Sequence, residues 1–224
     1  MRVNVLVLDG VFDLGLSAVL DAFQTANELI EISGLTAPRF EVKIAGVRKA
    51  VKTSQGLTVP VNATGWRTPD CVVVPAIGFK MPGPLEIALA RPDMQDAGAS
   101  LRQWASRGAT MTAACIGTFV MAESRLLDHQ HATTTWWLAP LFRKRYPKVL
   151  LDESNMIVKS GRFVTAGAAL SHMDLALWLV RGISPQLASL TAKYLIVDSR
   201  PAARASTRSR RLSDTRKARF CESC

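Results

Sequence analysis

Two hydrophobic patterns alternate along most of the chain. Short runs rich in β-branched residues are typical of buried strands, and longer stretches with apolar residues three or four positions apart are typical of helices. The first pattern predicts strands at residues 3–8, 40–47, 70–76 and 109–114, and a hairpin of 156–159 with 162–166. The second predicts helices from about 16 to 33, within 85–107, and at 119–127, 136–146, 170–180 and 184–197. This alternation predicts an α/β domain with a mainly parallel sheet.

Composition changes abruptly near the C-terminus. The chain has 224 residues, of which 48% are hydrophobic, enough for one well-filled core. Residues 200–224 hold eight Lys or Arg against two acids, so they carry +6 of the net charge of +10. We therefore expect one α/β domain at residues 1–199 and a basic, disordered tail at 200–224.

The cellular compartment is predicted from what the sequence does not contain. The N-terminus lacks the long apolar region of a secretory signal, and no stretch reaches the roughly 18 apolar residues of a membrane span. The chain has too few cysteines, too unevenly spaced, for disulfide bonds to stabilise the domain; they are Cys71, Cys115, Cys221 and Cys224. The sequence therefore predicts a cytoplasmic protein with no membrane contact.

Cys115 is the strongest candidate for chemistry. It follows the small, β-prone run A-T-M-T-A-A and precedes I-G-T-F-V, which begins a helical pattern. A cysteine at so sharp a strand-to-helix turn resembles a nucleophile elbow, where backbone N–H groups and the helix dipole favour the thiolate. A small buried cysteine without chemistry fits the spacing equally well.

Asp13 is the second candidate, because it lies between the first strand and its helix. The carboxyl ends of parallel strands share one edge, so Asp13 and Cys115 should face the same crevice. The Asp13 carboxyl group could hydrogen-bond a thiolate or act as a general acid. The alternative is that Asp13 simply caps the helix.

Four segments carry a resemblance to a known family. V-L-V-L-D-G-V-F-D-L-G-L-S-A-V-L-D-A-F, D-C-V-V-V-P-A, A-A-C-I-G-T-F-V-M-A-E-S-R-L-L-D and A-T-T-T-W-W occur in the order seen in the ThiJ/PfpI superfamily. They resemble the glutamine-amidotransferase-like sensor domain of AraC-type transcription regulators over residues 1 to about 200. The resemblance implies a flavodoxin-like sandwich with helices on both sheet faces, and a homodimer.

Three departures from the family pattern limit what the resemblance implies. Thr135 stands where enzymes of the superfamily have a histidine, so acyl transfer lacks its proton shuttle. Ile77 and Gly78 stand where many relatives have paired glycines that contribute to an oxyanion hole. The tail also offers neither the length nor the apolar pattern of a helix-turn-helix domain, so we expect DNA contact only through such a domain, which this sequence lacks.

The sequence therefore favours a non-catalytic sensor of an unknown small molecule, with no cofactor and no metal site. We expect the ligand to contact Asp13, Ile77–Gly78, Cys115–Ile116 and Thr135. One alternative is a cysteine-dependent hydrolase or hydratase, resembling the isonitrile hydratases, in which Asp13 and Cys115 are the catalytic residues. A second is a redox-sensing protein that oxidises Cys115.

Overall fold

The computed structural model describes residues 1–63 and 68–197, so the predicted tail, with Cys221 and Cys224, lies outside the described residues.

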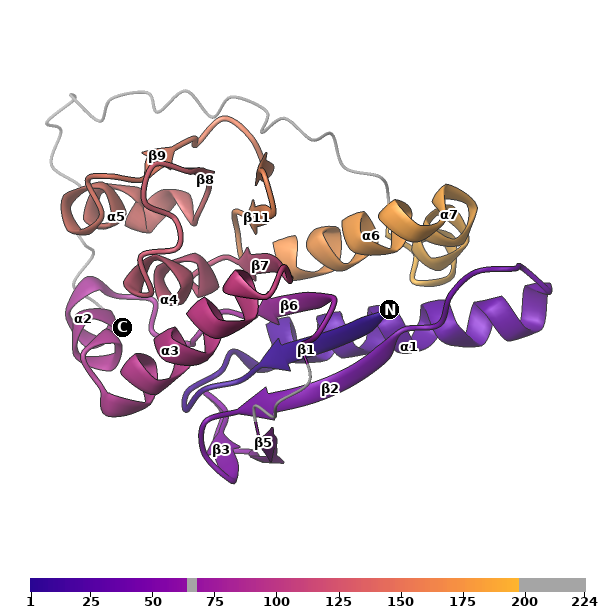
Figure 1. Cartoon of the computed structure of the whole chain (residues 1–224), viewed down its shortest axis with the longest axis horizontal. Coiled ribbons are helices and arrows are strands. Elements are labelled where there is room, and N and C mark those ends of the chain that lie inside the picture. The colour runs from indigo at the N-terminus through magenta and orange to yellow at the C-terminus, as the bar shows by residue number, and fades with distance from the viewer. Residues whose placement is uncertain (64–67, 198–224) are drawn as a thin grey trace, which may run out of the picture.

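Seven strands form the central sheet, in the order β10-β11-β7-β6-β1-β2-β5 (Figure 1). They are β1 Arg2–Leu6, β2 Glu41–Gly46, β5 Asn62–Ala63, β6 Cys71–Val74, β7 Thr110–Ala114, β10 Ile157–Ser160 and β11 Phe163–Ala166. All neighbouring pairs are parallel except β10 with β11. The predicted mainly parallel α/β architecture is confirmed.

Helices cover both faces of this sheet (Figure 1). One face is covered by α1 Asp13–Ser33, α6 Ser171–Ile183 and α7 Pro185–Tyr194. The other is covered by α2 Pro82–Leu89, α3 Pro92–Ser106, α4 Gly117–Glu123 and α5 Ala139–Arg145. Alternate residues of β6 enter the two cores, Val72 and Val74 on one side and Cys71 and Val73 on the other, which explains its uninterrupted apolar sequence.

Two small ladders complete the sheet structure. β3 Ala50–Lys52 and β4 Thr58–Pro60 form an antiparallel hairpin. β8 His131–Ala132 pairs in parallel with β9 Leu150–Leu151. The segment that follows β8, at residues 133–135, belongs to no strand.

Prolines account for two differences between predicted and observed helices. The stretch 85–107 holds two helices, since Arg91 is extended and Pro92 starts α3. The stretch 136–146 begins as a 3-10 turn, Trp136–Leu138, and becomes α-helical only at Ala139, with Pro140 in the first turn. Apolar spacing alone did not separate these pieces.

A buried amide fixes the start of β2 against α1. Asn27 donates from Nδ2 to the Phe40 carbonyl at 2.8 Å, and its Oδ1 accepts from the Phe40 N–H at 2.8 Å. Between them, α1 ends at Gly34, whose φ of 67° is the left-handed conformation that glycine adopts easily. The Asn27 side chain therefore connects the helix directly to the strand, independently of the loop between them.

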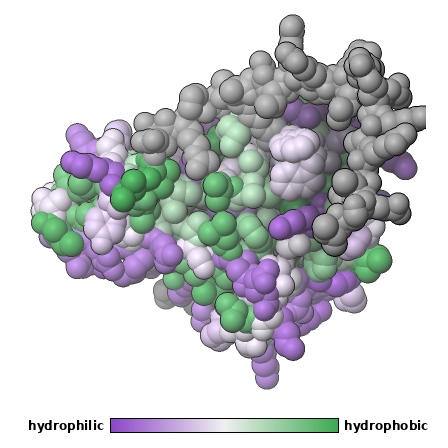
Figure 2. Space-filling model, turned by 180° about the vertical axis from the view of Figure 1, so that it is seen from behind, coloured by the Kyte–Doolittle hydropathy of each residue, from purple (hydrophilic) through white to green (hydrophobic). Residues whose placement is uncertain are grey.

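The face that carries α1 shows apolar side chains gathered across its middle, bordered by hydrophilic ones (Figure 2). Leu14 of α1 and Leu170, just before α6, are each about half exposed. Among the helices that the structure describes, none combines the length and the apolar character needed to cross a membrane.

Candidate functional site

Cys115 occupies a sharp turn between β7 and α4, as the small residues around it predict. Its φ is 58°, an unusual value for a residue with a side chain, and its N–H donates to the Ala166 carbonyl at 2.7 Å. A Cβ on Gly117 would lie 2.2 Å from the Val74 carbonyl oxygen and 2.7 Å from that of Pro75. Only glycine therefore lets α4 start so close to the end of β6. Cys115 is 3% exposed.

A run of threonines lies beside the elbow. Thr134 donates from its hydroxyl to the Cys115 carbonyl at 3.0 Å, and Thr118 of α4 donates to the Thr133 carbonyl at 3.0 Å. Thr135 is fully buried, and its hydroxyl oxygen has no hydrogen-bond partner within the described residues. Ile116, which follows the cysteine, is also buried. Thr135 therefore offers this site a hydroxyl group and no titratable group.

Asp13 does not cap α1, so that alternative is wrong. Phe12 holds the N-cap position and makes no side-chain capping bond, while Asp13 is the first helical residue. Asp13 Oδ2 instead accepts from Ser54 Oγ at 2.7 Å and from the Gln55 N–H at 3.0 Å. Its Oδ1 is buried without a hydrogen-bond partner in the described part of the chain.

Hydrogen bonds hold Asp13 in its ionised form. Burial acts to raise the pKa of this carboxyl group, but the hydrogen bonds from residues 53–55 outweigh burial and lower the pKa below its usual value. At neutral pH the group is a hydrogen-bond acceptor. It has no proton to donate as a general acid.

Ile77 and Gly78 extend the floor of the site next to Asp13. Ile77 forms an antiparallel bridge with Val11, and the Gly78 N–H donates to the Gly10 carbonyl at 2.7 Å. A Cβ on Gly78 would lie 2.4 Å from the Ser54 Cβ. The loop that binds Asp13 therefore packs directly on Gly78.

His172 joins the two parts of the site. Its Nε2 accepts the Ala76 N–H at 3.0 Å, and its Nδ1 lies 2.8 Å from the Ala169 carbonyl, which requires a proton on Nδ1. The ring also abuts Gly15, where a Cβ would lie 2.6 Å from Nε2. Burial lowers the pKa of His172 to about 4, so the ring is neutral and both nitrogens are occupied.

The predicted site residues thus fall into two groups at the carboxyl edge of the sheet. Asp13, Ile77 and Gly78 lie around the Ser54 loop and the strand-like bridge to Val11. Cys115 and Ile116 form the elbow, and Thr135 follows Thr134, whose hydroxyl group bonds the Cys115 carbonyl. The 75–76 segment, held by His172 and by Gly117, connects them. We keep the word crevice for this edge, as the place where the sequence predicts that a ligand binds.

Sequence reasoning missed Ser54 and the role of His172. The contact of Ser54 with Asp13 spans 41 residues, so no local pattern indicates it. The bond between His172 and Ala76 spans 96 residues and has no local sequence signal.

The amino-acid sequence is similar to those of known proteins. The sequence profile of the DJ-1/PfpI family matches residues 1–182. The HTH-type transcriptional regulator GbdR of Pseudomonas aeruginosa is 23% identical over 180 residues, which are 80% of this chain and 45% of GbdR. The chain thus spans less than half the length of this curated relative.

Solved structures share the fold. An AraC family transcriptional regulator from Pseudomonas putida superposes with a TM-score of 0.70 at 18% identity, covering 87% of this chain and 98% of that chain. Drosophila melanogaster DJ-1beta superposes with a TM-score of 0.68 at 19% identity, covering 88% and 97%. The same fold therefore occurs in regulators and in DJ-1 proteins.

Proposed function

Since the chain belongs to the DJ-1/PfpI family, we propose that it is a small-molecule-sensing regulatory domain of the kind that AraC-type transcription regulators carry. The ligand binds in the crevice and is not turned over. GbdR supports this proposal, because its similarity to the chain is confined to 45% of its length. In such a regulator the rest of the protein would contact DNA, and the domain would act in the cytoplasm.

The observation that carries the proposal is that no histidine is available as a base for Cys115. The chain has three histidines, all within the described residues. His172, the one at the crevice, has both ring nitrogens bonded and a pKa of about 4, so it cannot take a proton from a thiol at neutral pH. His129 and His131 lie in or beside β8, where His131 pairs with Leu150.

Two polar groups define what the crevice would recognise. Asp13 Oδ1 and the Thr135 hydroxyl are buried and unpartnered among the described residues, and leaving such groups unpaired costs free energy. A ligand that donates a hydrogen bond to the ionised Asp13 carboxylate and pairs with Thr135 would remove both penalties. Ligand binding would then stabilise the fold by mass action.

An isonitrile-hydratase-like enzyme is the rival function, favoured by the strained backbone of Cys115. The lowered pKa of Asp13 argues against it, because an ionised carboxylate is a poor proton donor.

The deciding experiment compares turnover with binding in a Cys221→Ser, Cys224→Ser background. We expect no loss of cyclohexyl isonitrile that depends on Cys115, and slow alkylation of Cys115 by iodoacetamide. Cys71 is an internal control for an inert thiol, since burial raises its pKa to about 12. We also expect a thermal-shift screen of cellular metabolites to find compounds that stabilise the parent and not Asp13→Asn. Isonitrile consumption abolished by Cys115→Ser would replace the sensor with the enzyme.

We also propose that the domain acts as a homodimer. The apolar surface of the α1 face, with half-exposed Leu14 and Leu170, supports an interface there (Figure 2). One chain has a mass of 24.4 kDa. Light scattering should give twice this mass for the parent protein and the single-chain mass for Leu14→Glu.

A further inference from the structure

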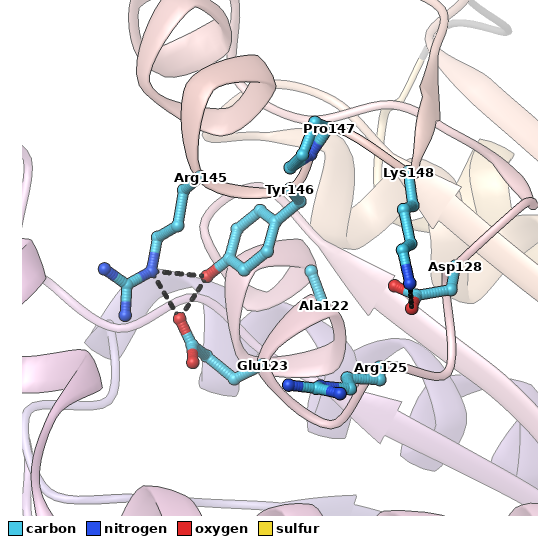
Figure 3. A pocket seen from close by; sticks show the side chains of 8 residues that line it. All are labelled: Ala122, Glu123, Arg125, Asp128, Arg145, Tyr146, Pro147 and Lys148. Carbon is cyan, nitrogen blue, oxygen red and sulfur yellow. Dashed lines mark hydrogen bonds and ion pairs between the residues drawn. The ribbon is translucent and has the colours of Figure 1, made fainter.

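A cavity lies at the opposite end of α4 from Cys115. Its volume is about 420 Å³, within the range of small-molecule sites. It is bounded by the end of α4, the turn that follows, and the end of α5 (Figure 3). Its lining residues are Ala122, Glu123, Arg125, Asp128, Arg145, Tyr146, Pro147 and Lys148.

One side of this cavity is a fixed polar network. Glu123 Oε1 accepts from Arg145 Nε and from the Tyr146 hydroxyl, each at 2.5 Å (Figure 3). Burial and the neighbouring Glu123 raise the pKa of Tyr146, so its hydroxyl stays protonated and keeps this bond. Glu123 and Arg145 therefore form an ion pair that adds no net charge to the cavity, and Arg145 can contribute further hydrogen-bond donors to it.

Backbone hydrogen bonds hold the walls in place. The His129 N–H donates to the Lys148 carbonyl at 2.8 Å, and the Leu150 N–H donates to the Gln130 carbonyl at 2.9 Å. The β8–β9 ladder continues this pairing. The cavity is therefore pre-formed, and binding would not have to order its walls.

The three cations of the cavity differ in how firmly they are paired. The Arg125 side chain makes no hydrogen bond or ion pair with any described residue, and its guanidinium lies below Ala122 in Figure 3. Lys148 Nζ forms an ion pair with Asp128 Oδ2, but at 3.9 Å this pair is too long to be a hydrogen bond. Arg145 uses only Nε in its bonds within the network, which leaves its two terminal nitrogens as further donors.

The simplest alternative is that these cations only neutralise the negative ends of two helices. Three carbonyl groups near these helix ends already have other partners, however. The Ser124 N–H and hydroxyl both donate to the Met121 carbonyl, the Arg125 N–H donates to Ala122, and the Tyr146 N–H donates to Phe142. Helix ends therefore do not account for three cationic side chains around one cavity.

The surrounding chain adds to the positive potential. Residues 101–162 contain nine Lys or Arg and four acids, a net charge of +5, whereas residues 1–199 as a whole carry +4. The positive charge of the domain is thus concentrated in the segment that builds this cavity, where it would raise the local concentration of anions.

We propose that the cavity binds the phosphate group of a small phosphorylated molecule, held by Arg125, Arg145 and Lys148. Arg125 follows α4, and Arg145 and Lys148 lie at and just beyond the end of α5, so cations from two segments line the space. This arrangement suits a tetrahedral dianion, whose acceptor oxygens point in several directions. This site is independent of the proposed function of the crevice.

The test is calorimetric titration of the full chain with inorganic phosphate at low ionic strength. Arg125→Gln and Lys148→Gln should each weaken binding about tenfold, because each removes one charge-assisted contact. The matched control is Arg181→Gln, which removes the same charge from an exposed position on α6, on the other face of the sheet. Circular dichroism should be unchanged in all three variants.

Any one of three results would overturn the proposal. The first is the absence of phosphate binding to the parent chain, and the second is equal weakening by all three variants, which would indicate a general charge effect. The third is tight binding of a short DNA duplex that Arg125→Gln and Lys148→Gln weaken while inorganic phosphate does not bind, which would assign these cations to a polyanion surface.

Discussion

The two ends of α4 use opposite means to build a site. At the first end, Gly117 lies against the backbone of β6, Cys115 is buried, and its N–H donates to the Ala166 carbonyl. At the second end, roughly 10 Å away, charged side chains surround an open cavity. Both ends carry a non-glycine residue in the left-handed conformation, Cys115 with φ 58° and Arg125 with φ 62°.

The two sites differ in whether main-chain or side-chain atoms form their walls. The crevice is shaped by main-chain atoms that cannot move without shifting the sheet, so substitutions there should cost stability. The cavity is lined by long side chains over a fixed frame, so substitutions there should change binding and leave the fold intact.

The largest expected effect is on folding, from Gly117→Ala. A Cβ would meet two backbone oxygens at 2.2 and 2.7 Å, so α4 or β6 must shift, at a cost of more than about 3 kcal/mol in the free energy of unfolding. Denaturant unfolding measures this cost. Gly182→Ala is the matched control, since a Cβ there meets nothing within 4 Å and alanine is the better helix former. Similar midpoints for the two variants would show that the elbow is not rigid.

The next effect is a dependence of stability on pH that originates at His172. Burial lowers its pKa to about 4 in the folded state, against about 6.5 when unfolded, so the unfolded chain binds the proton more tightly. The stabilising contribution, about 3 kcal/mol, is complete above pH 6.5 and is lost as the pH falls from 6.5 to 4. Subtracting the profile of His172→Gln from that of the parent isolates this contribution, because the carboxylates titrate in both proteins. A flat difference between pH 7 and 4 would mean that the ring is not buried as described.

A smaller effect of opposite sign is expected at the cavity. Arg125→Gly should raise the free energy of unfolding by about 1 kcal/mol, because glycine adopts the positive φ without strain. It should also weaken phosphate binding, since the guanidinium is lost. Denaturant unfolding and phosphate titration of the same sample test both parts. Loss of stability would show that the Arg125 side chain supports the fold.

Last, we expect Asp13→Asn to leave the affinity for phosphate unchanged. The asparagine can still accept from Ser54 and Gln55, and no described bond links Asp13 to the cavity. Titration with phosphate should therefore give the parent affinity. A weaker affinity would mean that the two ends of α4 are coupled.

Sequence reasoning succeeded where local pattern determines structure. The small residues around Cys115 predicted the turn, and the D-C-V-V-V-P-A run predicted a strand buried on both faces. The Asn27–Phe40 and His172–Ala76 bonds could not be predicted, because their partners are far apart in the chain. The cavity was missed for a related reason. The R-K-R-Y-P-K run was visible, but only the fold brings Arg125 and Asp128 beside it.

The amide clamp between Asn27 and Phe40 makes the 34–39 loop a natural place to insert foreign sequence. Because α1 and β2 are already joined on the inner side of this loop, its length does not set the register of the sheet. Doubling the length of a flexible loop costs only about 0.6 kcal/mol in closure entropy. A peptide tag or a fluorescent reporter could therefore be carried there while both termini stay unmodified.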